Sequence, residues 1–169
     1  MSDKMKNVQP LYGTETTERE QKDSVKKPIP TDFYCPAVDL DALLRKERNA
    51  TGLPHELTLV QIVGLWQLGN SYWYNPGRKA WDEAVSLLSA NVRTFFREDG
   101  SAEEYEAEFN TGNNPYHYDS ERRTLTWEGC EHYIVGLSPS HMEVITYEPI
   151  TSKHPYEEIH KFVYNKIGE

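Results

Sequence analysis

Aromatic side chains recur along the second half of the sequence and are the groups best suited to binding chemistry. The candidate ligand-binding rings are Phe96, Tyr105, Tyr116, Tyr118, Trp127 and Tyr133. Alternate residues of a strand share one face, so strands over these stretches would bring the rings onto a common surface. Buried rings remove large apolar areas from water, and buried tyrosine hydroxyls need hydrogen-bond partners. Two interpretations stay open: a pocket for a small apolar or aromatic molecule, or a core packed solid with side chains.

No pattern typical of catalysis accompanies these rings. The sequence contains no G-x-S-x-G motif and no G-x-x-x-x-G-K-[ST] loop. Its carboxylates alternate along the expected strands, as on a solvated face, instead of pairing in a cleft. The histidines form neither an H-E-x-x-H motif nor an i, i+4 pair. We therefore expect a protein that is not an enzyme and that has no metal site and no cofactor.

An acidic segment is the second candidate site. It comprises Glu98, Asp99, Glu103, Glu104, Glu106 and Glu108, with no basic residue between its ends. These groups form either a solvated strand face or a surface that captures a basic protein, as immunity, inhibitor and adaptor proteins do. The net charge of -9 argues against nucleic acid and anionic membranes as partners, because phosphate groups bind clustered Lys and Arg.

The elements that must position these residues change character along the chain. Residues 1–36 have few apolar groups and are predicted to form an extended or disordered arm. Two interpretations stay open: a disordered tail, or a docking arm anchored by Leu11 and Tyr12 that would act together with the acidic segment in binding a partner. Residues 37–58 are predicted to hold a short helix and a connector, because a leucine stripe precedes Gly52 and Pro54. Residues 59–169 remain as the main folded unit.

The main unit begins with a long strand pattern. Trp66, Leu68, Asn70, Tyr72 and Tyr74 are expected to share one face of it. Asn75-Pro76-Gly77 ends this strand, and the helical spacing of apolar residues in 78–88 predicts a short helix.

Three hairpins are predicted to follow. In the first, a two-residue turn at Asp99-Gly100 pairs Glu98 with Ser101 and puts Tyr105 on the face of Phe96, with Glu104 on the other face. In the second, Tyr118 pairs with Arg123, so that Tyr116, Tyr118, Leu125 and Trp127 share a face. In the third, Gly136 pairs with His141 and Tyr133 with Val144.

The last segment, residues 156–167, fits a helix or a strand, and its β-branched and aromatic content favours a closing strand. Seven or eight short strands with no helix between them predict a mainly β protein. Because closure removes both open edges of a meander, we expect an antiparallel up-and-down β-barrel with the N-terminal arm and one or two short helices.

Four stretches, taken in order, resemble the bacterial lipocalin-like domain family over roughly residues 59–148. They are the G-x-W strand "VGLWQL", "FFREDGSAEEYEAEF", "YHYDSERRTLTWEG" and "YIVGLSPSHMEVITYEP". The resemblance implies a small calycin-type barrel that performs no catalysis and binds a small apolar ligand. It also implies that Gly64 and Trp66 form the barrel base. Lipocalins often place a late arginine across this tryptophan, and here the late strand offers Lys161 and Lys166.

Two further features bear on the protein's surroundings. Cys35 and Cys130 lie far apart in sequence, which favours two free thiols over one disulfide. The first residues lack the apolar core of a signal peptide, and no segment approaches the roughly 18–20 apolar residues of a membrane span. We therefore expect a cytoplasmic protein without a membrane span, or an exported one if a leader precedes this sequence.

Overall fold

The computed structural model describes residues 37–86 and 88–169, so the predicted arm over residues 1–36 lies outside the described part. Within that part the chain forms one α-helix, α1 (Leu40–Thr51), and two 3-10 turns, η1 (Leu59–Gln61) and η2 (Leu88–Ala90). The strands are β1 (Gly64–Asn75), β2 (Ala80–Ser86), β3 (Val92–Phe96), β4 (Ser101–Glu106), β5 (Phe109–Asp119), β6 (Thr124–Trp127), β7 (Cys130–Ser138), β8 (His141–Glu148) and β9 (Glu158–Gly168).

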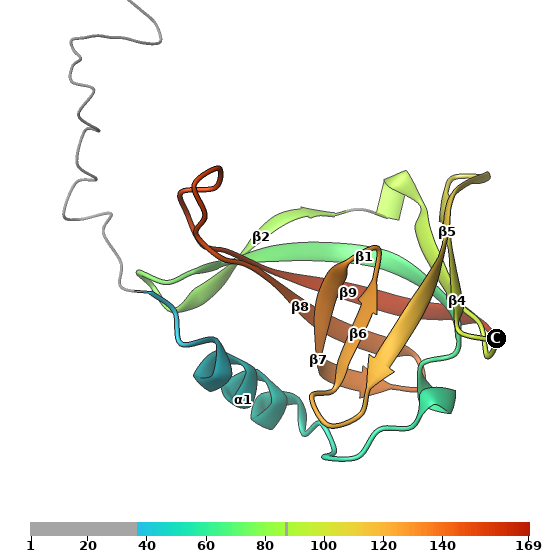
Figure 1. The fold of residues 1–169 in the computed structure, drawn as a ribbon, viewed down its shortest axis with the longest axis horizontal. Coiled ribbons are helices and arrows are strands. Elements are labelled where there is room, and N and C mark those ends of the chain that lie inside the picture. Colours follow the sequence, from blue (N-terminus) through green and yellow to red (C-terminus); the bar gives the residue numbers. More distant parts are fainter. Residues whose placement is uncertain (1–36, 87) are drawn as a thin grey trace, which may run out of the picture. The chain divides into compact units, whose positions relative to one another are not determined.

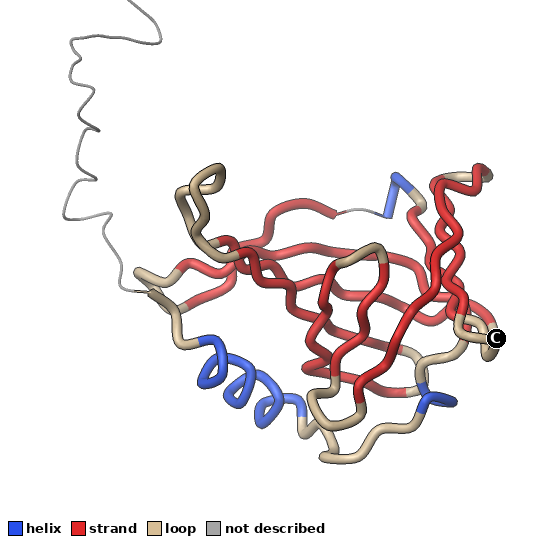
Figure 2. Tube along the Cα trace, viewed as in Figure 1, coloured by secondary structure: helices blue, strands red, loops and turns tan. Residues whose placement is uncertain are grey.

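Eight of these strands close an antiparallel barrel, which confirms the predicted fold class. The strand order is β1-β3-β4-β5-β6-β7-β8-β9, and β9 pairs back onto β1. In Figure 1 the labelled strands β1 and β4–β9 belong to the barrel and β2 lies beside β1, and Figure 2 shows the helix α1 outside the strands. The last segment is the closing strand β9, as its composition favoured.

Strand β1 has two neighbours on one side. Its first half pairs with β3, from Gly64 opposite Phe96, and its second half pairs with β2, up to Asn75 opposite Ala80. The predicted helix over 78–88 is therefore wrong, because most of this segment is the extra strand β2. The chain reverses at Asn75, whose side chain accepts from the backbone N–H of Arg78 at 3.1 Å. The open edge of β1 then offers backbone hydrogen bonds to this segment, and this pairing outweighs the weak helical spacing of its apolar residues.

A bulge divides β1 into two parts, and the alternation of inward and outward side chains is reversed after it. Opposite β9, Leu68 pairs with Tyr164 and Ser71 with Phe162, so β1 advances three residues while β9 advances two. Because side chains alternate, the extra residue moves the following side chains to the other face. The predicted common face of 66–74 thus ends at Leu68, and Tyr74 packs with the cluster under α1 instead.

Large side chains fill the barrel interior around Trp66. Trp66 and Phe96 are fully buried, and the indole N–H of Trp66 donates to the carbonyl oxygen of Ile62 at 2.7 Å. The ammonium of Lys166 lies 5.6 Å from the centre of the Trp66 ring. Gly64 has φ +140°, a conformation that other residues rarely adopt, and a Cβ there would lie 3.0 Å from the carbonyl oxygen of Gly168 and 2.4 Å from Cε of Lys166, so the backbone here favours glycine.

Helix α1 covers part of the outer face of the barrel. Asp39 caps its first turn by accepting from the N–H of Ala42 at 3.1 Å, and Gly52 ends it with φ 72°. Its buried residues Leu43 and Leu44 pack against an outward cluster that includes Val135. This confirms the short helix predicted within residues 37–58. The helices of the described residues are all too short or too polar to cross a membrane.

Candidate functional site

One end of the barrel interior is left unfilled and forms a cavity of about 460 Å³. Its lining combines apolar groups, rings, hydroxyls and carboxylates. The lining residues are Leu68, Val92, Thr94, Glu104, Tyr105, Glu106, Thr111, Trp127, Glu128, Cys130, His132, Thr146, Phe162 and Tyr164. A volume of this size lies in the range of sites that hold small molecules, roughly 300–1,000 Å³. We refer to it below as the mouth cavity.

The turn between β3 and β4 decides which side chains enter the mouth cavity. Phe96 pairs with Ala102, and the N–H of Arg97 donates to the carbonyl of Ser101 at 2.9 Å. The turn therefore has three residues and places Gly100 at φ 90°, in the left-handed region. The predicted pairing of Glu98 with Ser101 is wrong by one residue.

This one-residue difference exchanges the two faces of β4. Glu104, predicted to lie on the outer face, points into the barrel, where its Oε2 accepts from the indole N–H of Trp127 at 2.6 Å. Tyr105, predicted to face inward, still borders the mouth cavity, but its hydroxyl points outward and donates to Glu103 at 2.8 Å, and the Arg93 guanidinium covers its ring. The structure thus puts a carboxylate where the sequence predicted a phenol.

Glu104 and Glu128 converge above Gly112, which lies opposite Glu104 on β5. A Cβ on Gly112 would be 3.2 Å from Glu128 Oε2 and 3.7 Å from Glu104 Oε1, so the missing side chain makes room for both carboxylates. Burial raises the pKa of Glu104, the hydrogen bond from Trp127 opposes this rise, and the charge of Glu128 adds to it. Asn114 donates to Glu128 at 2.9 Å and holds its position.

His132 is the second polar group of the mouth cavity. It is 7% exposed, and its ring stacks on Trp127 with centroids 3.7 Å apart and planes 7° from parallel. Its Nδ1 lies 3.1 Å from the carbonyl of Cys130 and 3.3 Å from that of Leu125. Carbonyls only accept, so Nδ1 carries the proton and Nε2 offers a lone pair. Burial lowers the pKa of His132 to about 4, so the ring is neutral near pH 7.

Tyr164 and Phe162 form the β9 side of the mouth cavity. Tyr164 is 6% exposed, and burial raises its pKa above the ordinary value, so its hydroxyl stays protonated. Within residues 37–86 and 88–169, neither the Tyr164 hydroxyl nor Nε2 of His132 has a hydrogen-bond partner. Neither atom belongs to the fully enclosed, unpartnered side-chain atoms of the described residues, so both are reached from the mouth cavity and can bind a ligand there.

The structure separates the six predicted rings. Trp127 and Tyr105 line the mouth cavity. Phe96 and Tyr116 face inward but belong to the filled part, packed edge to face at 5.0 Å, with the Tyr116 hydroxyl donating to the carbonyl of Arg97 at 2.8 Å. Tyr118 packs against the same core, its hydroxyl 3.5 Å from the carbonyl of Leu57.

Tyr133 lies on the outer face, where its hydroxyl donates to Glu131 at 2.9 Å. The predicted pairing with Val144 is wrong: Tyr133 pairs with Ile145, Ile134 takes the place opposite Val144, and a bulge precedes Gly136. The inward residues of β7 are therefore His132 and Ile134.

The acidic segment does not form one face. Glu104 points into the barrel, Glu103 pairs with Arg97 at 3.0 Å, and Asp99 accepts from the backbone N–H of Ser101 at 2.9 Å. Glu98, Glu106 and Glu108 are exposed. The outer acidic surface is thus smaller than the sequence suggested.

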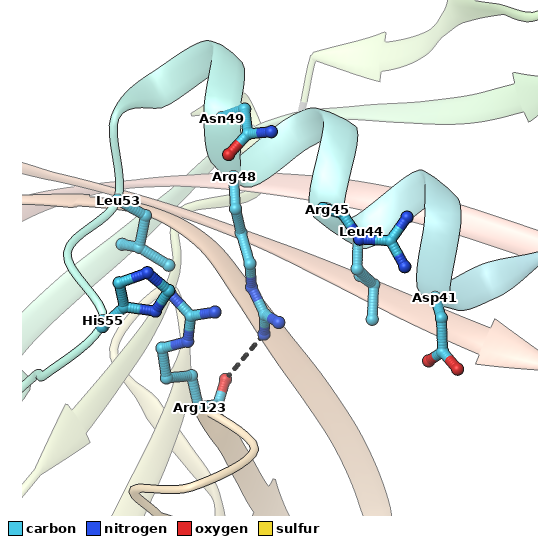
Figure 3. A pocket seen from close by; sticks show the side chains of 8 residues that line it. All are labelled: Asp41, Leu44, Arg45, Arg48, Asn49, Leu53, His55 and Arg123. Carbon is cyan, nitrogen blue, oxygen red and sulfur yellow. Dashed lines mark hydrogen bonds between the residues drawn. The ribbon is translucent and has the colours of Figure 1, made fainter.

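A second hollow, of about 350 Å³, lies between α1 and the β6 side of the barrel. It is lined by Asp41, Leu44, Arg45, Arg48, Asn49, Leu53, His55 and Arg123, as Figure 3 shows. We call it the helix pocket. Arg48 extends from α1 and donates to the carbonyls of Ile134 at 2.8 Å and Arg122 at 3.0 Å, and Arg123 donates to that of Pro54 at 2.9 Å. Burial, and then the neighbouring Arg123 charge, lower the pKa of Arg48 to about 10.

One group of side chains offers metal-ligand atoms. The nearest such atoms of Glu148, His154 and Glu158 all lie within 4.8 Å of one another, beside the β8–β9 loop. Sequence spacing gave no sign of this group. Exposed carboxylates often gather without an ion, so the group alone does not define a metal centre.

The chain matches no model of a known protein family and no curated protein sequence. The fold and the mouth cavity therefore carry the functional argument. The sequence did not predict that the main polar groups of the mouth cavity, Glu104, His132 and Tyr164, face inward. For His132 the signal was present in the sequence, since it precedes buried Ile134 by two positions on one strand.

Proposed function

We propose that this protein is a non-catalytic binding protein of the lipocalin-like type, which holds a small molecule with an apolar or aromatic body in its barrel. The observation that carries the proposal is the mouth cavity, about 460 Å³ in a barrel whose other end is filled. Trp127, Phe162 and Leu68 supply apolar walls, and His132 and Tyr164 supply polar groups that fix orientation.

The contact at the barrel base supports the lipocalin-like assignment. Lys166 of the last strand lies over the ring of Trp66, where lipocalins often place an arginine. Gly64 provides the room for this lysine. The resemblance seen in the sequence and the contact at the base are independent of the mouth cavity.

A cavity-filling substitution tests the proposal. Thr146 lines the mouth cavity, so Thr146→Trp should displace the ligand, whereas Thr126→Trp, on the outer face of β6, should not. Native mass spectrometry of protein isolated from its own host should show a bound mass on the wild type and on Thr126→Trp and none on Thr146→Trp. An unliganded mass for all three proteins would contradict the proposal.

A second candidate is an acidic interaction module of the immunity, inhibitor or adaptor kind. Phe109 favours it, because this ring is 70% exposed on the β4–β5 hairpin, next to the exposed Glu108 and opposite the exposed Glu106. A basic protein partner should bind there, and Glu106→Lys with Glu108→Lys should abolish its capture. Unchanged capture by the charge-reversed protein would reject this surface. The arm, the other part of this candidate, lies outside the described residues.

A further inference from the structure

The mouth cavity carries an unbalanced negative charge. Glu104, Glu106 and Glu128 line it, and none of the described residues in its lining is Lys or Arg. The nearest arginines of β3 and its turn are engaged outside, Arg93 over the Tyr105 ring and Arg97 with Glu103. No protein cation described here therefore neutralises these carboxylates.

The polar groups that lack partners also favour a hydrogen-bond donor. His132, only 7% exposed, is fixed by two carbonyls with its proton on Nδ1, so Nε2 can only accept. Tyr164, 6% exposed, has a hydroxyl that accepts or donates. These observations are independent of the carboxylates and indicate a ligand rich in N–H donors.

The rings of the mouth cavity suit a positive charge as well. Trp127, Phe162 and Tyr164 present π-electron density, which attracts a cation near a ring face. Leu68 and Val92 complete the apolar lining, which suits the body of the ligand. Charge, acceptors and rings thus favour the same class of molecule.

We propose that the ligand is a protonated primary amine attached to an apolar or aromatic body. Its ammonium lies between Glu104 and Glu128 and donates towards Nε2 of His132, while its body packs against Phe162. This inference rests on the proposed function and names the ligand class of the same site.

Isothermal titration calorimetry of the full chain with a matched pair of compounds tests the inference. Tryptamine and tryptophol share an indole and a two-carbon chain and differ in carrying an ammonium or a hydroxyl. Near pH 7 tryptamine should bind about tenfold more tightly than tryptophol, as expected for one charge-assisted contact in a partly buried site. Thr146→Trp should bind neither compound.

Two variants locate the effect. Glu104→Gln combined with Glu128→Gln should remove the about tenfold preference by weakening tryptamine binding, with tryptophol affinity unchanged. Glu108→Gln, an exposed acid on the hairpin, should keep the preference. Equal affinities of the wild type for the two compounds would overturn the charge inference and leave the proposed function standing. Binding of neither compound, by a protein whose native mass also carries no ligand, would overturn the proposed function itself.

Discussion

The mouth cavity and the helix pocket are two hollows of similar size with opposite charge. The first has three carboxylates and no Lys or Arg among its described lining, and the second has three arginines and one carboxylate, Asp41. Their polar groups differ in a second way. In the helix pocket the donors of Arg48 and Arg123 are used by backbone carbonyls, whereas in the mouth cavity His132 and Tyr164 keep groups without partners among the described residues. Charge alone therefore does not distinguish a ligand-binding site from a structural contact between elements. Whether the polar groups already have hydrogen-bond partners does distinguish them.

The largest expected effect concerns the helix pocket. Arg48→Ala should lower the free energy of unfolding by about 2–4 kcal/mol, because it removes bonds to the carbonyls of Ile134 and Arg122 and detaches α1 from β7. Arg45→Ala is the matched control and should cost less than about 0.5 kcal/mol, since Arg45 is exposed. Urea unfolding measures both. Equal losses for the two variants would show that the carbonyl contacts of Arg48 do not fasten the helix.

The next effect concerns the buried histidine of the mouth cavity. In the unfolded chain His132 takes up a proton near its ordinary pKa of 6.5, but in the fold only near about 4, so acid favours the unfolded state between these values. Over that window the wild type should lose about 2 kcal/mol more stability than His132→Phe, a variant that does not titrate and still stacks on Trp127. Urea unfolding at a series of pH values gives the difference. Parallel pH profiles would mean that His132 is solvated in the fold.

The smallest effect is expected at Glu104. Burial raises the pKa of Glu104, so ionisation of this carboxyl opposes folding. The free energy of unfolding should therefore fall as the pH rises above the ordinary pKa of glutamate. Glu104→Gln keeps an acceptor for Trp127 and should raise the free energy of unfolding at neutral pH by less than about 1 kcal/mol. Thermal unfolding at neutral pH checks this. A clear loss of stability would show that the charge of Glu104 supports the fold, which would weaken its assignment to ligand binding.

The sequence predicted the barrel because alternation and turn residues are local signals, but it did not predict which side chains enter the mouth cavity. The second hairpin shows why an error can be harmless. Tyr118 pairs with Leu125 instead of Arg123, a slip of two residues, so Tyr116 and Trp127 still face inward as predicted. Slips by an even number preserve the faces of a strand.

Errors of one residue in the predicted register exchange the two faces of a strand, and they occurred at the strands that line the mouth cavity. Asp99-Gly100 fits turns of two or three residues, and only the three-residue turn directs Glu104 into the barrel. The bulge in β1 after Leu68 depends on its pairing with β9, at the far end of the chain. Local patterns cannot report such distant pairing. The strand β2 was predicted as a helix for another reason, because its apolar residues have weak helical spacing and its strand conformation depends on pairing with the adjacent β1.

Strand β2 also bears on how the protein avoids its own copies. Among the described strands it pairs only with β1, so its second edge exposes backbone groups that a strand of another molecule can recruit. Asp82 and Glu83 lie in the middle of this edge strand, and Glu83 is exposed. Asp82 is paired with Arg78, so Glu83 is the negative charge that repels its counterpart on an approaching copy. Among the described strands, the one that does not take part in barrel closure thus carries an exposed charge that opposes edge-to-edge aggregation.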